Sequence, residues 1–197
     1  MKKPKLHIQI APAAATLFLG MLLTDRSMLC LAAILAAGFH ELGHLFAARY
    51  LHIPMRSLRL DLIGARLDTE GRLLSYGEEW LLCAAGPLFS LILAILPAGL
   101  WSVSAFARQL SCASLLLGIL NLLPIRTFDG GRMLSAFLCA TLGDRVSARV
   151  VNACSFLFLF LLWCSAVYCL MRVGDGLSLL CFSMSLFSRF FELSDPL

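Results

Sequence analysis

The stretch GFHELGHLFAARY, residues 38–50, decides the fold, because it places ionisable side chains inside a long apolar run, 28–51. Its centre, His40-Glu41-Leu42-Gly43-His44, is an H-E-x-x-H pattern. In a helix, residues i and i+4 share a face, so both imidazoles can reach one zinc ion while Glu41 stands near the attacking water. Ionisable groups within a membrane span are costly and mark functional sites. The pattern predicts a zinc site in a membrane helix, with Glu41 as the catalytic base.

The composition of the whole chain excludes an ordinary water-soluble globule. Hydrophobic residues make up 60% of it, charged residues only 14%, and the mean hydropathy is +0.87. A helix needs about 20 apolar residues to cross a bilayer. Apolar runs of nearly that length or more occur at 8–23, 28–51, 80–101, 110–124, 150–171 and 176–191. We therefore expect an all-α polytopic membrane protein with about six transmembrane helices, forming a single integral-membrane domain over residues 1–197.

The distribution of basic residues predicts the orientation of these spans. If all six runs cross, every Lys and Arg except Arg26, Arg108 and Arg172 falls on the side of the N-terminus. The positive-inside rule then places both termini in the cytoplasm and the chain in the cell membrane. The basic start before 8–23 also fits a signal peptide, but a second apolar run follows at once, which favours a retained span. The arginines are spread over loops, so we expect no nucleic-acid partner.

Residues 57–73, SLRLDLIGARLDTEGRL, differ from the apolar runs on either side. Leucines alternate with charged residues, as in Leu58-Arg59-Leu60-Asp61. A period of two is typical of a strand with one apolar face. The stretch predicts a small cytoplasmic β-hairpin, and a solvated amphipathic loop is the alternative.

A catalytic zinc ion needs a third protein ligand and keeps one position open for water. Asp129 is the acidic residue that follows an apolar run and precedes two glycines, Gly130 and Gly131. Glycines let the backbone approach a crowded site closely. We therefore expect His40, His44 and Asp129 to bind one Zn²⁺ per chain.

The residues before Asp129 are candidates for binding substrate. Pro124 cannot continue a helix normally, so the fourth span is expected to break there. Broken backbone at membrane depth is tolerated where it is buried in protein or lines a water-filled cavity, and extended backbone can pair with a substrate strand. We name Asn121, Pro124 and Gly130 as candidate substrate-binding residues. For Asn121, a hydrogen bond that only joins two helices is the alternative.

Two motifs together resemble the site-2 protease family of intramembrane zinc metalloproteases, peptidase family M50. They are H-E-L-G-H at 40–44 and N-L-L-P-I-R-T-F-D-G-G at 121–131, and Ala85-Gly86-Pro87 is similar to a third family element. The resemblance implies a three-helix catalytic core at about 28–142. It also implies zinc ligation by His40, His44 and Asp129, catalysis by Glu41 and substrate contact by Asn121.

Within that family, the compact six-span plan is most similar to the sporulation-type branch, which includes the stage IV sporulation protein FB. That branch implies processing of a sporulation sigma-factor precursor. The chain has room for neither a PDZ nor a CBS domain. It also departs from the family at Ser90, where an Asn is frequent. A second departure is at 126–128, because Pro-Leu more usually precedes the Asp-Gly pair.

These observations predict a metalloendopeptidase that cuts peptide bonds in or next to transmembrane segments. Its partners would be a transmembrane or membrane-associated protein substrate, the lipid bilayer and a membrane-protein regulator. Two alternatives remain: a non-catalytic protein that binds zinc or handles ions, and a zinc hydrolase of lipid amides. A structural zinc site usually includes Cys among four protein ligands, and the eight cysteines lack suitable spacing with His40 and His44.

Overall fold

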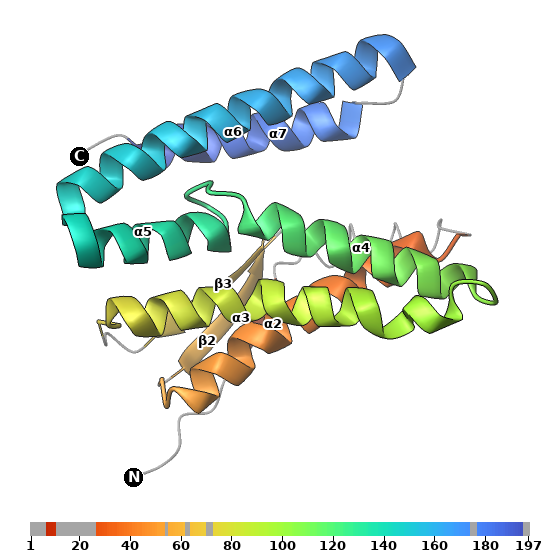
Figure 1. The fold of residues 1–197 in the computed structure, drawn as a ribbon, viewed down its shortest axis with the longest axis horizontal. Helices are drawn as coiled ribbons and strands as arrows, with labels where there is room; N and C mark the ends of the chain where they lie inside the picture. Colours follow the sequence, from red (N-terminus) through yellow and green to blue (C-terminus); the bar gives the residue numbers. More distant parts are fainter. Residues whose placement is uncertain are drawn as a thin grey trace. The chain divides into compact units, whose positions relative to one another are not determined.

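The structure is a computed structural model that describes residues 7–10, 27–53, 55–61, 64–69, 73–173 and 177–194. Contacts between residues divide the chain into two compact units, Met1–Ile119 and Leu120–Leu197. Each unit is described by itself, and Figure 1 labels their helices and strands.

Three helices dominate the first unit: α2 (Leu29–Tyr50), α3 (Tyr76–Ile95), which continues as the 3₁₀ helix η1 (Leu96–Leu100), and α4 (Ala105–Leu122), whose last residues pass into the second unit. Helix α3 begins at a capping box. The Ser75 hydroxyl accepts the N–H of Glu78 at 3.3 Å, and the Glu78 carboxylate accepts the N–H of Ser75 at 2.9 Å. These bonds satisfy two backbone donors at the helix terminus and define where α3 starts.

Helices α2 and α3 pack closely at Gly43, which lies inside the H-E-x-x-H motif. A Cβ atom on Gly43 would lie 2.5 Å from the carbonyl oxygen of Ala85 on α3. Glycine is therefore required for the two backbones to approach this closely. The contact brings the face of α2 that carries the histidines against α3.

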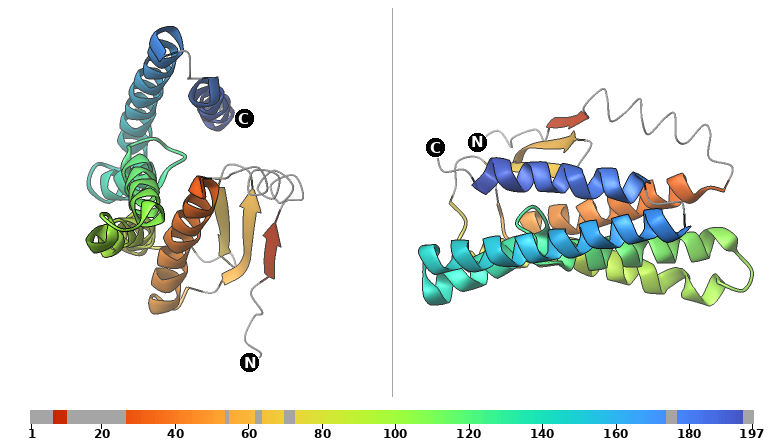
Figure 2. Two further views of the ribbon diagram at one scale, coloured as in Figure 1. Left: turned by 90° about the vertical axis from the view of Figure 1, so that its right-hand side faces the viewer. Right: turned by 90° about the horizontal axis from the view of Figure 1, so that it is seen from above.

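A three-stranded sheet completes the first unit and lies beside α2 (Figure 2). Its strands are β1 (His7–Ile10), β2 (Met55–Asp61) and β3 (Gly64–Thr69), in the order β1-β2-β3. Strand β1 pairs parallel with β2, and β2 pairs antiparallel with β3, with Leu58 opposite Leu67. Strands β2 and β3 fall where the alternating pattern predicts strands. Strand β1 does not: residues 8–10 were expected to begin a membrane span, whose remainder, 11–23, lies outside the described residues.

The second unit contains α5 (Asp129–Leu142), α6 (Asp144–Val173) and α7 (Leu177–Ser194). Gly143 separates α5 from α6 with a φ of 81°, a conformation that favours glycine. Helices α6 and α7 run side by side in opposite directions (Figures 1 and 2). Their shared core includes Leu159 of α6 and Leu186 of α7.

Four helical segments of the described chain are long and apolar enough to cross a membrane: Leu29–Tyr50, Tyr76–Leu100, Ala105–Leu122 and Asp144–Arg172. They correspond to the second to fifth apolar runs. Helix α7, at the sixth run, is not among these four, and α5 was not expected from the apolar runs. Large apolar side chains such as Leu42 and Phe46 are exposed on α2, which suits a surface that faces lipid. Together these features indicate a multi-pass membrane protein.

Candidate active site

Helix α2 places His40 and His44 on one face, as their spacing predicts. Both side chains are buried, with exposed fractions of 4% and 9%. Their Nε2 atoms lie only 3.2 Å apart, so the two rings point at a common position. Glu41 follows His40 in the same helical turn and is half-buried.

The other nitrogen of each ring is held by a partner on α3. Nδ1 of His44 lies 2.8 Å from the carbonyl oxygen of Leu82, and Nδ1 of His40 lies 2.9 Å from the hydroxyl of Ser90. A carbonyl can only accept, so Nδ1 of His44 donates and Nε2 of the neutral ring carries a lone pair. Contacts of this kind fix the tautomer and orientation of metal-binding histidines.

Gly86 lets the backbone of α3 approach both histidine rings closely. A Cβ atom at this position would lie 2.7 Å from Nε2 of His40 and 2.5 Å from Cε1 of His44, and closer still to Nε2 of His44. Any other residue would therefore place its Cβ atom in conflict with the two imidazole rings. The glycine of the Gly86-Pro87 element thus allows α3 to pack against the histidine pair.

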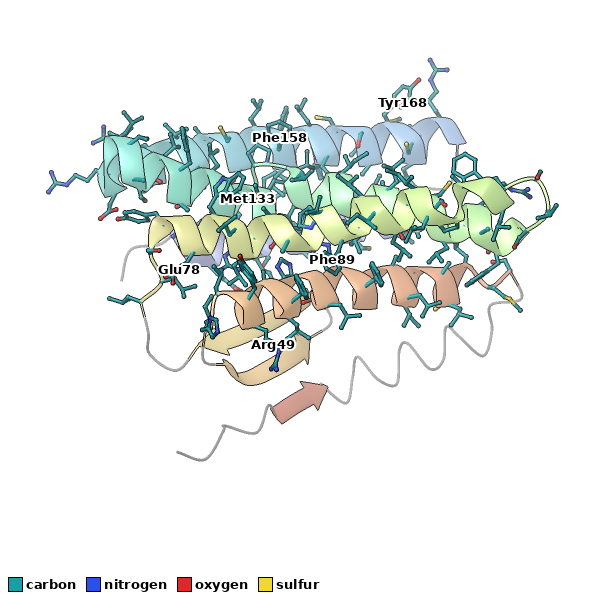
Figure 3. The ribbon with its side chains drawn as sticks, turned by 60° about the horizontal axis from the view of Figure 1, so that its bottom comes forward. Arg49, Glu78, Phe89, Met133, Phe158 and Tyr168 are labelled. Atoms are coloured by element: carbon teal, nitrogen blue, oxygen red, sulfur yellow. The ribbon has the colours of Figure 1, made fainter. Side chains whose placement is uncertain are left out.

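An aromatic cluster packs α2 against α3 beside the histidines. The ring of Phe89 on α3, labelled in Figure 3, lies between two rings of α2, with centroid distances of 5.7 Å to Phe39 and 5.8 Å to Phe46. Phe39 directly precedes His40. These contacts stabilise the helix pair next to the polar site.

Asp129 is the first residue of α5 in the second unit, and its side chain is 9% exposed. The positive end of a helix dipole stabilises a carboxylate at this position. Helix α4 ends at Leu122, and residues 123–128 form a bend and turn that contain Pro124. The predicted break of the fourth span before Asp129 is therefore confirmed.

The two glycines after Asp129 let the chain fold back on this segment. A Cβ atom on Gly130 would lie 2.7 Å from the carbonyl oxygen of Leu123, and one on Gly131 would lie 2.7 Å from the backbone nitrogen of Arg126. Both glycines are buried. Their small size holds the 122–126 backbone against the first turn of α5, which carries Asp129.

Ser155 of α6 holds the same segment from the other side. Its hydroxyl accepts the backbone N–H of Arg126 at 2.8 Å and donates to the carbonyl of Val151 at 2.7 Å. Ile125, which is 1% exposed, packs against Leu159 of α6. The sequence patterns did not identify Ser155, because it lies 29 residues beyond Arg126 and outside any motif.

His40, His44 and Asp129 form a group that could hold a metal ion. Two nitrogens bound tetrahedrally to zinc at about 2.0–2.1 Å are about 3.3–3.4 Å apart. The 3.2 Å between the Nε2 atoms is close to that value. Two imidazole nitrogens and one carboxylate oxygen are also a typical donor set for catalytic zinc, so the residues present suit the ion.

The three residues predicted to bind substrate all lie in or beside the break. Asn121 is half-buried in the last turn of α4, and Pro124 is half-buried in the bend. Gly130 is buried against the chain's own backbone. A role in substrate binding stays a prediction for each of these three residues.

Comparisons with known proteins found similar sequences and a similar fold. The profile of Peptidase family M50 matches residues 97–165. The chain is also 34% identical to "Putative zinc metalloprotease Rip3" from two strains of Mycobacterium tuberculosis, Erdman and H37Rv, over 63% of this chain and 33% of Rip3. It therefore spans about a third of the length of these curated relatives. These matches support peptidase family M50.

One solved structure has a fold similar to that of this chain. The site-2 protease from Methanocaldococcus jannaschii is similar over 100% of this chain and 94% of its own, with a TM-score of 0.65. Their sequence identity is 21%, so this likeness is evidence for the fold alone.

Proposed function

We propose that this chain is an intramembrane zinc metalloprotease that hydrolyses peptide bonds in or next to the transmembrane segments of other membrane proteins. The observation that carries the proposal is the histidine pair, whose Nε2 atoms converge at 3.2 Å while Leu82 and Ser90 hold both Nδ1 atoms. The M50 and Rip3 matches support a metalloprotease, and the apolar helices support a site at membrane depth.

In this proposal, His40, His44 and Asp129 bind one zinc ion. A bound zinc ion supplies Lewis acidity, which polarises a peptide carbonyl and makes water more acidic at neutral pH. The Glu41 carboxylate takes a proton from the attacking water and returns it to the leaving amine. Its place beside His40 on α2 puts it next to the predicted ligands.

The broken segment around Pro124 would position the substrate. Residues 123–128 are not helical, so not all of their backbone N–H and C=O groups form helical hydrogen bonds. Backbone of this kind can pair with an extended substrate strand. We propose that Asn121, Pro124 and Gly130 shape this contact, and that the substrate is a membrane segment that unwinds locally to expose its carbonyls.

A reconstitution experiment tests this function. Purified protein in lipid vesicles should cleave a single-span model substrate, lose that cleavage to background with a zinc chelator, and regain it when zinc is added back. The His44→Ala and Asp129→Asn variants should lose both zinc and cleavage. Asp144→Asn is the matched control, because Asp144 is also the first residue of a helix, α6, but is exposed.

Two outcomes would favour the alternatives. Chelator-sensitive release of an acyl chain from a lipid amide, without peptide cleavage, would indicate a lipid amidase. Bound zinc with no hydrolysis of either substrate would indicate a non-catalytic zinc protein. Cleavage of a sporulation sigma-factor precursor on co-expression would extend the proposal to the sporulation-type branch.

We further propose a six-span arrangement with both termini in the cytoplasm, in which α7 and the part of the first apolar run that follows β1 add two crossings to the four apolar segments. The positive-inside count over the loops supports this orientation. A reporter enzyme that is active only outside the cytoplasm should be inactive when fused at residue 197, and active when inserted in the turn at residues 101–104, between η1 and α4. The reverse pattern would contradict the proposed orientation.

A further inference from the structure

Ser90 of α3 is fully buried, with 0% of its side chain exposed. Its hydroxyl lies 2.9 Å from Nδ1 of His40, although the two residues are 50 positions apart in sequence. Gly118 of α4 lies opposite, where a Cβ atom would come within 3.2 Å of the Ser90 Cβ. Ser90 is therefore enclosed between two helices and contacts one of the proposed ligands.

The hydrogen bond of Ser90 differs from those of several other helical serines. A serine in a helix commonly donates to a carbonyl of the preceding turn. Ser155, Ser165 and Ser183 do so, at 2.7, 2.8 and 2.8 Å. The Ser90 hydroxyl is instead paired with an imidazole on the neighbouring helix. Its hydrogen bond is therefore made with His40 and not with the backbone of its own helix.

The direction of the hydrogen bond between Ser90 and His40 determines which nitrogen of His40 presents a lone pair to a metal. If Nδ1 of His40 donates to the Ser90 hydroxyl, Nε2 presents a lone pair beside that of His44. The Leu82 carbonyl already enforces this tautomer in His44. A hydroxyl can also donate to Nδ1, so the same side chain suits the His40 ring when its proton lies on Nε2.

We propose that Ser90 is a positioning residue that holds the His40 ring in the orientation required for metal binding. The inference rests on the proposed zinc site. It assigns a role to a residue that is not one of the proposed metal ligands. Ligands without such a partner typically lose metal affinity, because the ring is free to rotate or to adopt the other tautomer.

The test measures zinc affinity by competition with a chromophoric chelator in the full-length protein. We expect Ser90→Ala to weaken zinc binding about 10–100-fold, the range found for outer-shell partners of metal ligands. Ser90→Cys should have an intermediate effect, because a thiol of similar shape forms weaker hydrogen bonds. The graded order Ser, Cys, Ala is a result that a purely structural role would not produce.

Ser114 provides a matched control. It is also 0% exposed and lies in an apolar helix, α4, but its hydroxyl has no hydrogen-bond partner among the described residues. Ser114→Ala therefore removes the same atom from a similar environment and should leave zinc affinity unchanged. Circular dichroism should show the same helical content for all variants.

The outcomes separate this inference from the proposed function. If wild type binds zinc through His44 and Ser90→Ala binds it equally well, the role of Ser90 is overturned and the metal site stands. An equal loss of zinc in Ser90→Ala and Ser114→Ala would also overturn it, because helix packing would then be the cause. If wild type binds no zinc that depends on His44, the metal site itself fails.

Discussion

Replacing Glu41 by Gln should reduce peptide cleavage by at least about 100- to 10,000-fold, the usual contribution of a general base. Gln has nearly the same shape as Glu but cannot take a proton from water. Glu41 is half-buried in the same turn of α2 as His40, so the substitution should leave the histidine pair in place. The measurement is the rate of substrate cleavage in lipid vesicles, together with the zinc content of the purified variant.

Zinc content is the essential companion measurement, because it separates lost chemistry from lost metal. Glu79→Gln is the matched control, since Glu79 is also half-buried and lies on the neighbouring helix α3. That variant should retain both zinc and cleavage. Unchanged cleavage in Glu41→Gln would rule out Glu41 as the general base.

The Gly86→Ala variant should lose zinc and cleavage together. The added methyl group would clash with both histidine rings, since it would lie 2.7 Å from Nε2 of His40 and 2.5 Å from Cε1 of His44. The rings cannot easily turn aside, because their Nδ1 atoms are held by the hydroxyl of Ser90 and the carbonyl of Leu82. We expect zinc affinity to fall by at least about 100-fold, the upper end of the effects seen outside the ligand set itself.

Gly77→Ala is the control for this experiment. Gly77 lies in the same helix, and no atom of the described residues would lie within 4 Å of a Cβ atom there. Alanine is a better helix former than glycine, so this variant should be at least as stable as wild type. Retention of zinc by Gly86→Ala would show that metal binding does not depend on the close approach of α3 to the two rings.

Elements that depend on local periodicity could be predicted from the sequence. Residues i and i+4 of any helix share a face, so the pairing of His40 with His44 follows from their spacing alone. Apolar runs predicted the positions of α2, α3, α4 and α6, and alternation predicted strands near residues 57–69. Helix α5 was missed, because its amphipathic sequence does not read as an apolar run.

The sequence by itself determined the two histidines, the glutamate between them, the break at Pro124 and the choice of Asp129 as a candidate ligand. Only the tertiary structure decided how the histidines are held. The Leu82 carbonyl and the Ser90 hydroxyl lie 38 and 50 positions from the rings that they contact. A backbone carbonyl has no signature in a sequence, and a serine in an apolar run resembles any other small residue. Their roles appear only when α3 packs against α2 at Gly43 and Gly86, because that packing sets which atoms meet.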